Sequence, residues 1–204
     1  MSTHLQPLVT ATDLEFFRDD ISVFGRLSFE LEAGSMVLVE GANGSGKTTL
    51  LRMLAGFIQP GAGQMEWDPE FEHNLQTAYL GHYLGIKDEL TALENLVFLQ
   101  RLAGYRTGPD CKAVLKDLEL GDFEDATAGQ LSAGQRKRVA LGGLLAAPRQ
   151  LWLLDEPFAA LDRAGIAQVE RLISEHLDNS GSVVMSTHGA LGVHLERLQH
   201  INLS

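Results

Sequence analysis

The chain has 204 residues, a formal net charge of −11 at pH 7 and a hydrophobic content of 45%, which is typical of a globular domain. The acidic balance argues against nucleic acid as the main partner, because phosphate backbones are bound by basic surfaces. The single cysteine, Cys111, excludes an internal disulfide, and we expect neither a signal peptide nor a membrane-spanning segment.

The first part of the chain predicts strands around a single helix. Apolar residues alternate along the first two strands, whereas the third is a short, nearly continuous apolar run. The helix at 47–57 has apolar residues at helical spacing, and Gly56 is placed to end it because glycine accepts the left-handed backbone found after many helices. The strands are expected at residues 8–16, 26–34, 36–40, 63–67 and 77–82.

The second part of the chain predicts helices first and buried strands later. Thr91 and Glu94 form a capping box that starts a helix at 91–104. Residues 151–155 are apolar up to the final aspartate, which predicts a strand buried on both faces. Further helices are expected at 110–120, 132–148 and 163–177, and further strands at 182–186 and 201–204. We therefore expect a single α/β domain over residues 1–204, with a core of 1–82 and 148–204 and an inserted helical subdomain at about 83–147.

The sequence GANGSGKT at 41–48 matches the phosphate-loop pattern and lies between a predicted strand and a predicted helix. Its glycines let backbone N–H groups curl around phosphate oxygens, and the N-terminus of the helix attracts negative charge. In such a loop Lys47 reaches the β- and γ-phosphates of a nucleotide and Thr48 binds Mg²⁺. The alternative is a plain glycine-rich turn. The residues expected to surround the phosphates are Gly41, Ala42, Asn43, Gly44, Ser45, Gly46, Lys47, Thr48 and Thr49.

The sequence LWLLDEP at 151–157 predicts the second half of the same site. Asp155 ends a buried strand, and open parallel sheets bind their ligands at the carboxyl ends of strands. We expect Asp155 to bind Mg²⁺ through water, and Glu156 to act as the general base that orients the attacking water. The alternative role of the two carboxylates is to cap a turn or a helix.

The sequence LSAGQRKR at 131–138 predicts a second anion site. Ser132 can cap the following helix with Gln135 as its capping-box partner. Gly134 keeps the backbone N–H groups of this helix start open to an anion. The basic run 136–138 is expected to be a solvated helix face rather than a patch that binds nucleic acid.

The order of these motifs (phosphate loop, L-S-x-G-Q signature, then an apolar strand ending in Asp-Glu) resembles that of the ATP-binding-cassette (ABC) ATPases over nearly the whole chain. The resemblance implies a P-loop NTPase fold with a mixed central sheet and a helical insertion. It also implies a homodimer in which two copies enclose two Mg-ATP. The signature residues that would contact the γ-phosphate of the partner's ATP are Ser132, Ala133, Gly134 and Gln135, with Ala133 in place of the usual glycine.

Two further motifs have roles that the resemblance implies. AALD resembles the D-loop, so Asp162 would lie at the dimer seam; its alternative role is to cap the helix that follows. VVMSTH places His188 just after a strand, like the switch histidine that contacts the γ-phosphate. His188 would then join Lys47 and Glu156 as a catalytic residue.

Two positions depart from the family pattern. ABC ATPases stack adenine on an aromatic residue upstream of the phosphate loop, and that place falls on Phe17 or Arg18, either of which can stack. The family usually has a glutamine where the chain enters the helical insertion, but here His82 and Tyr83 stand there. Tyrosine is a poor Mg²⁺ ligand near neutral pH. We expect this joint to transmit movement without touching the metal, or else the Tyr83 ring to pack it as a plug.

The stretches LGHYLGIKDELTALENL and LWLLDEPFAALD, in so short a chain, resemble the ATPase subunits of the haem exporter of bacterial cytochrome c biogenesis. The resemblance implies a peripheral subunit on the cytoplasmic face of the inner membrane, docked on integral membrane subunits. Its ATP hydrolysis would power export of haem or release of a haem-loaded chaperone. We expect ATP and Mg²⁺ as ligands and no direct binding of haem or nucleic acid. The alternatives are a transporter ATPase with another cargo and a soluble ABC ATPase of DNA repair or translation.

Overall fold

The computed structural model of the chain describes residues 7–187 and 198–203. The chain divides into two compact units. The sheet unit comprises Met1–Gly81, Gln150–Pro157 and Leu172–Ser204, and the helical unit comprises His82–Arg149 and Phe158–Arg171. The strands are β1 (Pro7–Arg18), β2 (Ile21–Glu32), β3 (Met36–Gly41), β4 (Ala62–Trp67), β5 (Thr77–Leu80), β6 (Leu151–Asp155), β7 (Ser182–Ser186) and β8 (Leu198–Leu203). The α-helices are α1 (Lys47–Leu54), α2 (His73–Gln76), α3 (Ala92–Leu102), α4 (Cys111–Asp117), α5 (Ala133–Ala146) and α6 (Arg163–Asp178).

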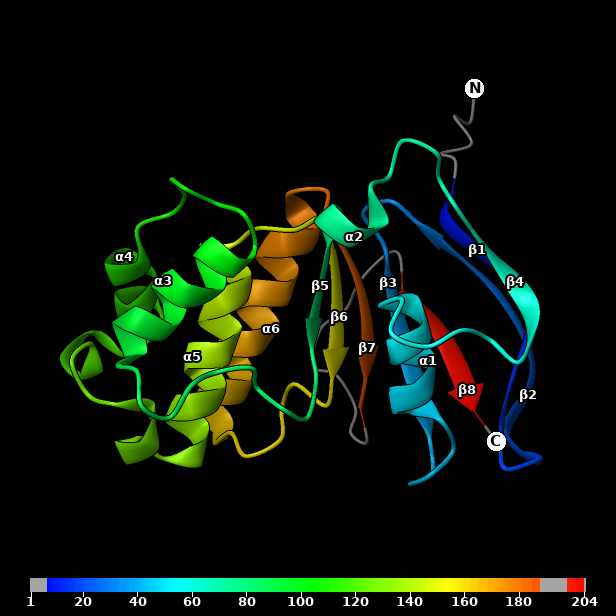
Figure 1. The fold of residues 1–204 in the computed structure, drawn as a ribbon, viewed down its shortest axis with the longest axis horizontal. Helices are drawn as coiled ribbons and strands as arrows, with labels where there is room; N and C mark the ends of the chain where they lie inside the picture. Colours follow the sequence, from blue (N-terminus) through cyan, green and yellow to red (C-terminus); the bar gives the residue numbers. More distant parts are fainter. Residues whose placement is uncertain (1–6, 188–197, 204) are drawn as a thin grey trace. The chain divides into compact units, whose positions relative to one another are not determined.

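A five-stranded sheet forms the centre of the sheet unit, in the order β5-β6-β7-β3-β8. Every neighbouring pair in it is parallel, so the carboxyl ends of its strands meet at one edge (Figure 1). All residues of β6 and β7 are buried, which confirms the prediction of a strand buried on both faces at 151–155. Because β7 lies between β3 and β6, the residues that end these three strands are neighbours.

The antiparallel strands form a separate three-stranded sheet in the order β2-β1-β4. A two-residue turn joins β1 to β2 at Asp19 and Asp20, whose φ angles are 51° and 61°. Positive φ at both central residues matches the turn to the twist of the strands that it connects. The prediction of one mixed sheet is therefore corrected to two sheets. The physical reason is that a tight turn pairs neighbouring strands with each other, whereas parallel strands need long crossover connections.

The hydrophobic core of the sheet unit is built around α1. Leu50, Leu51, Met53 and Leu54 of this helix are at most 1% exposed. They share one cluster with buried side chains of both sheets, so α1 is held from two directions. The other buried members of the cluster are Leu8, Val9, Ala11, Leu14, Phe24, Phe29, Leu31, Val37, Val39, Phe71, Leu151, Leu153, Val184, Ile201 and Leu203.

The end of α1 follows the prediction made for Gly56. The φ angle of Gly56 is 74°, and its N–H donates to the carbonyl oxygen of Met53 at 2.9 Å. The N–H of Phe57 donates to the carbonyl oxygen of Arg52, also at 2.9 Å. These two bonds are the Schellman motif, which satisfies the last carbonyl groups of a helix.

The helical unit contains both predicted capping boxes. At the start of α3 the N–H of Glu94 donates to Thr91 Oγ1 at 3.1 Å, and the N–H of Thr91 donates to Glu94 Oε2 at 2.8 Å. The same reciprocal pair between Ser132 and Gln135 starts α5. Both predictions succeed because a capping box depends on residues three apart in the sequence.

Two features of the helices differ from the sequence analysis. The four-residue helix α2 was not predicted, because so short a segment has no periodic pattern. The segment Phe158–Arg171, which includes the first part of α6, groups with the helical unit. Within the described ranges no helix is long and apolar enough to cross a membrane.

Candidate functional site

The predicted phosphate loop connects the end of β3 to the start of α1. Gly46, at the N-cap of α1, has a φ of 97°, and the helix start has no side-chain cap and no acidic residue in its first turn. A Cβ atom at Gly46 would lie 2.7 Å from the ring of Phe24 and 3.0 Å from Val23. Only glycine fits there, because the backbone is left-handed and pressed against β2. The first N–H groups of α1 therefore stay available to an anion.

Side chains of the loop complete this cradle. Lys47 is 6% exposed, and its ammonium group donates to the carbonyl oxygens of Gly41 at 2.8 Å and Ala42 at 3.0 Å. Among the described residues, the buried Ser45 Oγ has no hydrogen-bond partner. A buried hydroxyl without a partner is costly, and a phosphate oxygen would satisfy it. The loop therefore fits a phosphate by backbone conformation, charge and donor groups together.

The carboxyl end of β6 carries the two predicted acidic residues. Asp155 is 4% exposed, and its Oδ1 accepts a hydrogen bond from Ser186 Oγ at 2.7 Å. The same hydroxyl accepts the backbone N–H of Glu156 at 3.0 Å. Ser186 pairs in register with Asp155 on one side and with Val39 of β3 on the other. The structure thus brings Asp155 and Glu156 to the edge of the sheet from which the phosphate loop starts.

Oxygen atoms suited to Mg²⁺ are present at this edge. Thr48 lies half-buried in the first turn of α1, next to the buried Thr49, and Asp155 offers a carboxylate. Hard Mg²⁺ is bound through few protein oxygens together with water and substrate phosphates, so these residues fit the ion. Among the residues that the structure describes, no group of three or more His, Cys, Asp or Glu side chains could hold a metal.

Burial raises the pKa of Tyr79, and the nearby Asp155 carboxylate raises it further.

The predicted signature lies in the helical unit. Ser132 Oγ accepts the N–H of Gln135 at 3.2 Å, and Gln135 Oε1 accepts the N–H of Ser132 at 2.9 Å. Ser132 and Ala133 are exposed. A Cβ atom at Gly134 would lie 3.2 Å from the carbonyl oxygen of Ala160, so a side chain would crowd this helix start. The start of α5 is thus exposed at Ser132 and Ala133, and the three residues 132–134 are small.

Residues 87–91, which follow the joint at Tyr83, are tied to the segment that precedes the signature. The N–H of Ala128 donates to the carbonyl oxygen of Leu90 at 2.8 Å, and the N–H of Gly129 donates to that of Asp88 at 3.0 Å. The fully buried Asn95 holds the same residues from α3: its Oδ1 accepts from the N–H of Lys87 at 2.7 Å. Its amide group donates to the carbonyl oxygens of Lys87, Leu90 and Thr91.

The basic run at 136–138 is not a solvated face, which corrects the sequence analysis. Lys137 is 4% exposed, and the Arg138 side chain is 16% exposed and forms ion pairs with Glu119 and Asp162. Arg136 pairs with Asp88 at 2.7 Å. Tertiary contacts of α5, which the sequence pattern does not show, cover these side chains.

Asp162 caps α6, as one of its two predicted roles requires. Its Oδ1 accepts the N–H of Gly165 at 2.8 Å, and its carbonyl oxygen accepts the N–H of Ile166 at 2.9 Å. The side chain remains 71% exposed, so a contact with another chain is compatible with the cap. His188 lies outside the described residues.

The positions that depart from the family pattern are all at the surface. Phe17 is 44% exposed and lies against Gly61, where a Cβ atom would be 3.0 Å from its ring. Arg18 is exposed at the end of β1. Tyr83 is 86% exposed, and its ring centroid lies 6.0 Å from that of His82. Tyr83 therefore does not pack the joint as a plug in the helical unit.

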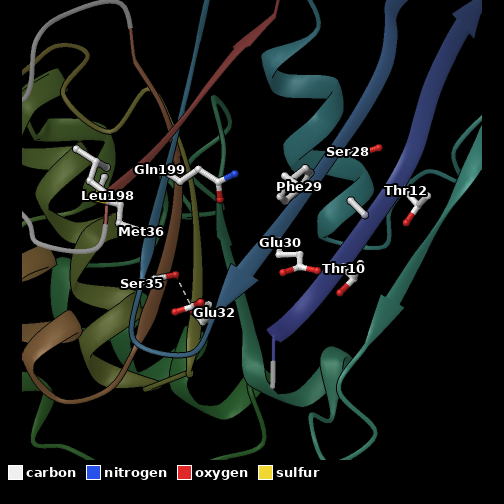
Figure 2. A pocket seen from close by; sticks show the side chains of 11 residues that line it. Thr10, Thr12, Ser28, Phe29, Glu30, Glu32, Ser35, Met36, Leu198 and Gln199 are labelled. Atoms are coloured by element: carbon white, nitrogen blue, oxygen red, sulfur yellow. Dashed lines mark hydrogen bonds between the residues drawn. The ribbon is translucent and has the colours of Figure 1, made fainter. Parts of the chain in front are cut away.

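A cavity of about 610 Å³ lies elsewhere in the sheet unit. Figure 2 shows Thr10, Ser28, Glu30 and Glu32 on its wall, from β1 and β2. None of its lining residues belongs to the predicted site. Two carboxylates would repel a phosphate, so this cavity is not a nucleotide site.

A parallel sheet with a glycine-rich loop between β3 and α1 defines the class of P-loop NTPases. Residues 24–159 match the family model described as ABC transporter. The cytochrome c biogenesis ATP-binding export protein CcmA of Shewanella sp. (strain MR-7) is 44% identical over 98% of this chain and 96% of its own length. The protein of that name from Xanthomonas axonopodis pv. citri (strain 306) is 48% identical over 90% of this chain and 88% of its own. The chain therefore belongs to the ABC transporter family and, within it, to the CcmA family.

Solved structures agree with this assignment at the level of the fold. An ABC transporter ATP-binding protein from Pyrococcus furiosus has a TM-score of 0.81 at 24% identity and covers 96% of each chain. The ADP conformation of an ATP-binding cassette of an ABC transporter has a TM-score of 0.73 at 21% identity, over 91% of this chain and 83% of its own. The predicted class of fold, a P-loop NTPase of the ABC ATPase type, is confirmed. The chain is an ATP-hydrolysing transport ATPase, a subunit that works with membrane partners.

Sequence reasoning missed the residues that hold the predicted site residues and the residues after the joint in place. Ser186 contacts both acidic residues, and Asn95 holds the residues after the joint, yet neither lies in a recognisable motif. A buried polar residue within or next to an apolar run is the only signal that marks them in the sequence. Their partners are distant along the chain, so the sequence cannot name them.

Proposed function

We propose that this chain powers the export step of bacterial cytochrome c biogenesis, in which ATP hydrolysis drives export of haem or release of a haem-loaded chaperone. The observation that carries the proposal is the 44–48% identity to CcmA proteins over 90–98% of the chain. The phosphate loop, with its uncapped helix start and its unpartnered Ser45 hydroxyl, supports ATP as the energy source.

In this proposal the loop at 41–49 binds the phosphates of ATP. Backbone N–H groups at the start of α1 donate to phosphate oxygens, and Lys47 leaves its carbonyl partners to reach the β- and γ-phosphates. Phe17 or Arg18, both exposed near the β1–β2 turn, stacks on the adenine ring. Burial of Lys47 at the base of the loop strengthens its attraction for the phosphates.

Thr48 and Asp155 would hold Mg²⁺, which when bound would neutralise charge that develops on the γ-phosphate. Glu156 follows Asp155 directly and accepts a proton from the attacking water. Before this transfer Glu156 orients the water in line with the γ-phosphate, which is the main requirement of phosphoryl transfer. His188 contacts the γ-phosphate as the switch histidine.

A second copy of the chain completes each site. The exposed start of α5, with Ser132, Ala133, Gly134 and Gln135, presents N–H groups to the γ-phosphate of the partner's ATP. Asp162, exposed beside its capping bond, lies at the seam between the copies. Closure of this homodimer on two ATP molecules excludes water, and opening follows release of phosphate.

The subunit docks at the cytoplasmic face of the inner membrane through its integral membrane partners. The joint at His82 and Tyr83 passes the opening of the dimer to those partners without binding the metal, because no good Mg²⁺ ligand stands there. We expect no direct contact with haem or nucleic acid. The core comprises residues 1–82 and 148–204, and the helical subdomain comprises residues from about 83 to 147. The signature belongs to the helical subdomain.

The test is a deletion strain of the source bacterium complemented with wild-type or Lys47→Ala protein. Wild-type protein is expected to restore haem-stained c-type cytochromes, and the variant is expected to fail. Protein captured from membranes in mild detergent should bring integral membrane subunits with it, as identified by mass spectrometry. Normal c-type cytochromes in the deletion strain, combined with an active ATPase, would show that the cargo is a different one.

A further inference from the structure

The hydroxyl group of Ser186 is shared between the two acidic residues at the end of β6. It donates to Asp155 Oδ1 at 2.7 Å and accepts the N–H of Glu156 at 3.0 Å. Ser186 is fully buried. A serine hydroxyl has one donor and two acceptor positions. Here the hydroxyl donates its hydrogen to the carboxylate and accepts the backbone N–H through a lone pair.

The backbone at Glu156 is in a conformation that needs support. Its φ is 50°, in the left-handed region that residues other than glycine rarely adopt. This turn breaks the alternation of side chains along β6 and sets the direction in which the Glu156 side chain leaves the strand. The bond from its N–H to Ser186 ties the turn to the neighbouring strand.

The bond from Ser186 holds the Asp155 carboxylate through its Oδ1 atom. Hydrogen bonds of this kind orient the groups that ligate a metal and hold them in place. Because Ser186 also pairs in register with Val39 of β3, it fixes the Asp155 carboxylate and the Glu156 backbone relative to the strand that leads into the phosphate loop.

We propose that Ser186 is a positioning residue for ATP hydrolysis, whose hydroxyl directs the Asp155 carboxylate and the Glu156 backbone toward the reacting phosphate. This inference rests on the proposed roles of Asp155 and Glu156. It predicts a defect in the chemical step rather than in nucleotide binding, because these two hydrogen bonds of the hydroxyl go to the end of β6 and not to the phosphate loop.

The experiment compares S186A, S186T and S186C in the transporter complex purified with its membrane subunits. S182A is the matched control, since Ser182 is an equally buried serine at the other end of β7. Its hydroxyl accepts the N–H of Gly34 at 3.0 Å, away from the acidic residues. Each complex is assayed for kcat, for KM of ATP and for affinity toward a fluorescent ATP analogue.

We expect S186A to lower kcat by about tenfold to a hundredfold, because it leaves a buried N–H and a carboxylate without their partner. The KM and the affinity for the analogue should change by less than about threefold. S186T keeps the hydroxyl and should recover most of the lost kcat. Cysteine has the same branching as serine, but its slightly larger thiol is only a weak donor and acceptor, so S186C should have an intermediate kcat. This variant tests the inference even if the extra methyl group of threonine disturbs folding. S182A should keep kcat within about twofold of wild type.

Equal kcat for S186A and S182A would overturn the inference, as would a loss of nucleotide affinity in S186A as large as its loss of kcat. The variant E156Q separates this outcome from a failure of the proposed function. If E156Q is inactive while S186A turns over normally, only the role of Ser186 is wrong. If E156Q hydrolyses ATP at the wild-type rate, the assigned role of Glu156 is wrong whatever Ser186 does.

Discussion

Arg136, in the first turn of the signature helix α5, lies 2.7 Å from the Asp88 carboxylate, which belongs to the residues just after the joint. The two residues are far apart in sequence, yet they connect the signature to residues 87–91 within the helical unit. Backbone bonds from Ala128 and Gly129 reinforce the same connection. Residues 87–91 and the start of α5 are therefore held together as one substructure within the helical unit.

The first prediction separates the two side chains that hold this substructure together. Asn95→Ala should lower the free energy of unfolding by about 3 kcal/mol, because it removes the four hydrogen bonds of a fully buried amide and leaves the N–H of Lys87 without its partner. Asp88→Asn should cost less than about 1 kcal/mol, because an ion pair that is partly exposed contributes little. Urea denaturation measures both. Equal losses would contradict this prediction, because they would show that the ion pair contributes as much as the buried amide.

The second prediction concerns Lys47. Lys47→Ala should lower kcat for ATP by at least about a hundredfold, because it removes the cation nearest to the phosphates. The control is Lys112→Ala, which removes an exposed lysine of helix α4 that pairs with Glu124. This variant should keep full activity. A steady-state phosphate-release assay measures both, and comparable rates for the two variants would contradict the role of the phosphate loop.

The third prediction concerns Glu156. Glu156→Gln should bind ATP but fail to hydrolyse it, because the amide cannot take a proton from water. The ATP-bound dimer should then accumulate and elute as a dimer in size-exclusion chromatography, whereas wild type with ATP returns to monomer after turnover. An E156Q protein that stays monomeric in saturating ATP would argue against the two-copy site.

The fourth prediction concerns pH and His176, whose ring stacks on Trp152 with centroids 3.9 Å apart. Burial lowers the pKa of His176, although backbone contacts with Ser182 and Gln150 oppose the shift. In the unfolded chain His176 is therefore protonated near pH 6.5, whereas in the folded chain it is protonated only at lower pH. Stability from this residue is complete above about pH 6.5 and falls as the pH drops toward the lowered folded pKa.

His176→Phe keeps an aromatic ring against Trp152 but removes the titrating group. The difference in free energy of unfolding between pH 7 and pH 5 should then become smaller than in wild type. Urea denaturation followed by circular dichroism provides the measurement. The control is His200→Phe, which removes an exposed histidine beside Glu40. An unchanged pH dependence in His176→Phe would show that other groups account for the acid sensitivity.

The fifth prediction concerns the joint. Tyr83 is 86% exposed, so Tyr83→Phe should leave the free energy of unfolding within about 0.5 kcal/mol of wild type. Tyr83→Gln places the family's usual residue at this position. If both variants match wild type in ATPase activity and in cytochrome c maturation, the side chain has no role in the metal site. A gain in ATPase activity with glutamine alone would instead indicate direct contact with the metal or its water.

Local signals explain what the sequence could predict. The capping boxes at Thr91 and Ser132 and the helix end at Gly56 each involve residues within a few positions of one another, so the structure confirms them. The apolar run at 151–155 likewise reports its own burial. The phosphate loop was found because its pattern and its place between a strand and a helix are visible together in the sequence.

Contacts between distant residues explain what the sequence could not predict. The burial of Lys137 and Arg138 depends on neighbours of α5 in the folded helical unit. The division of the strands into two sheets depends on pairing choices, and the link from Ser186 to Asp155 and Glu156 spans about 30 positions. The roles of the site residues themselves remain predictions until variants are assayed.

Both tryptophans of the chain, Trp67 and Trp152, belong to the sheet unit, and each ring lies against an imidazole, His73 or His176. Intrinsic tryptophan emission is therefore a signal of the sheet unit alone, whereas far-ultraviolet circular dichroism is dominated by helices of both units. Coincident midpoints from the two probes would mean that the units melt as one cooperative body. Separate midpoints would give each unit its own melting temperature without any added label.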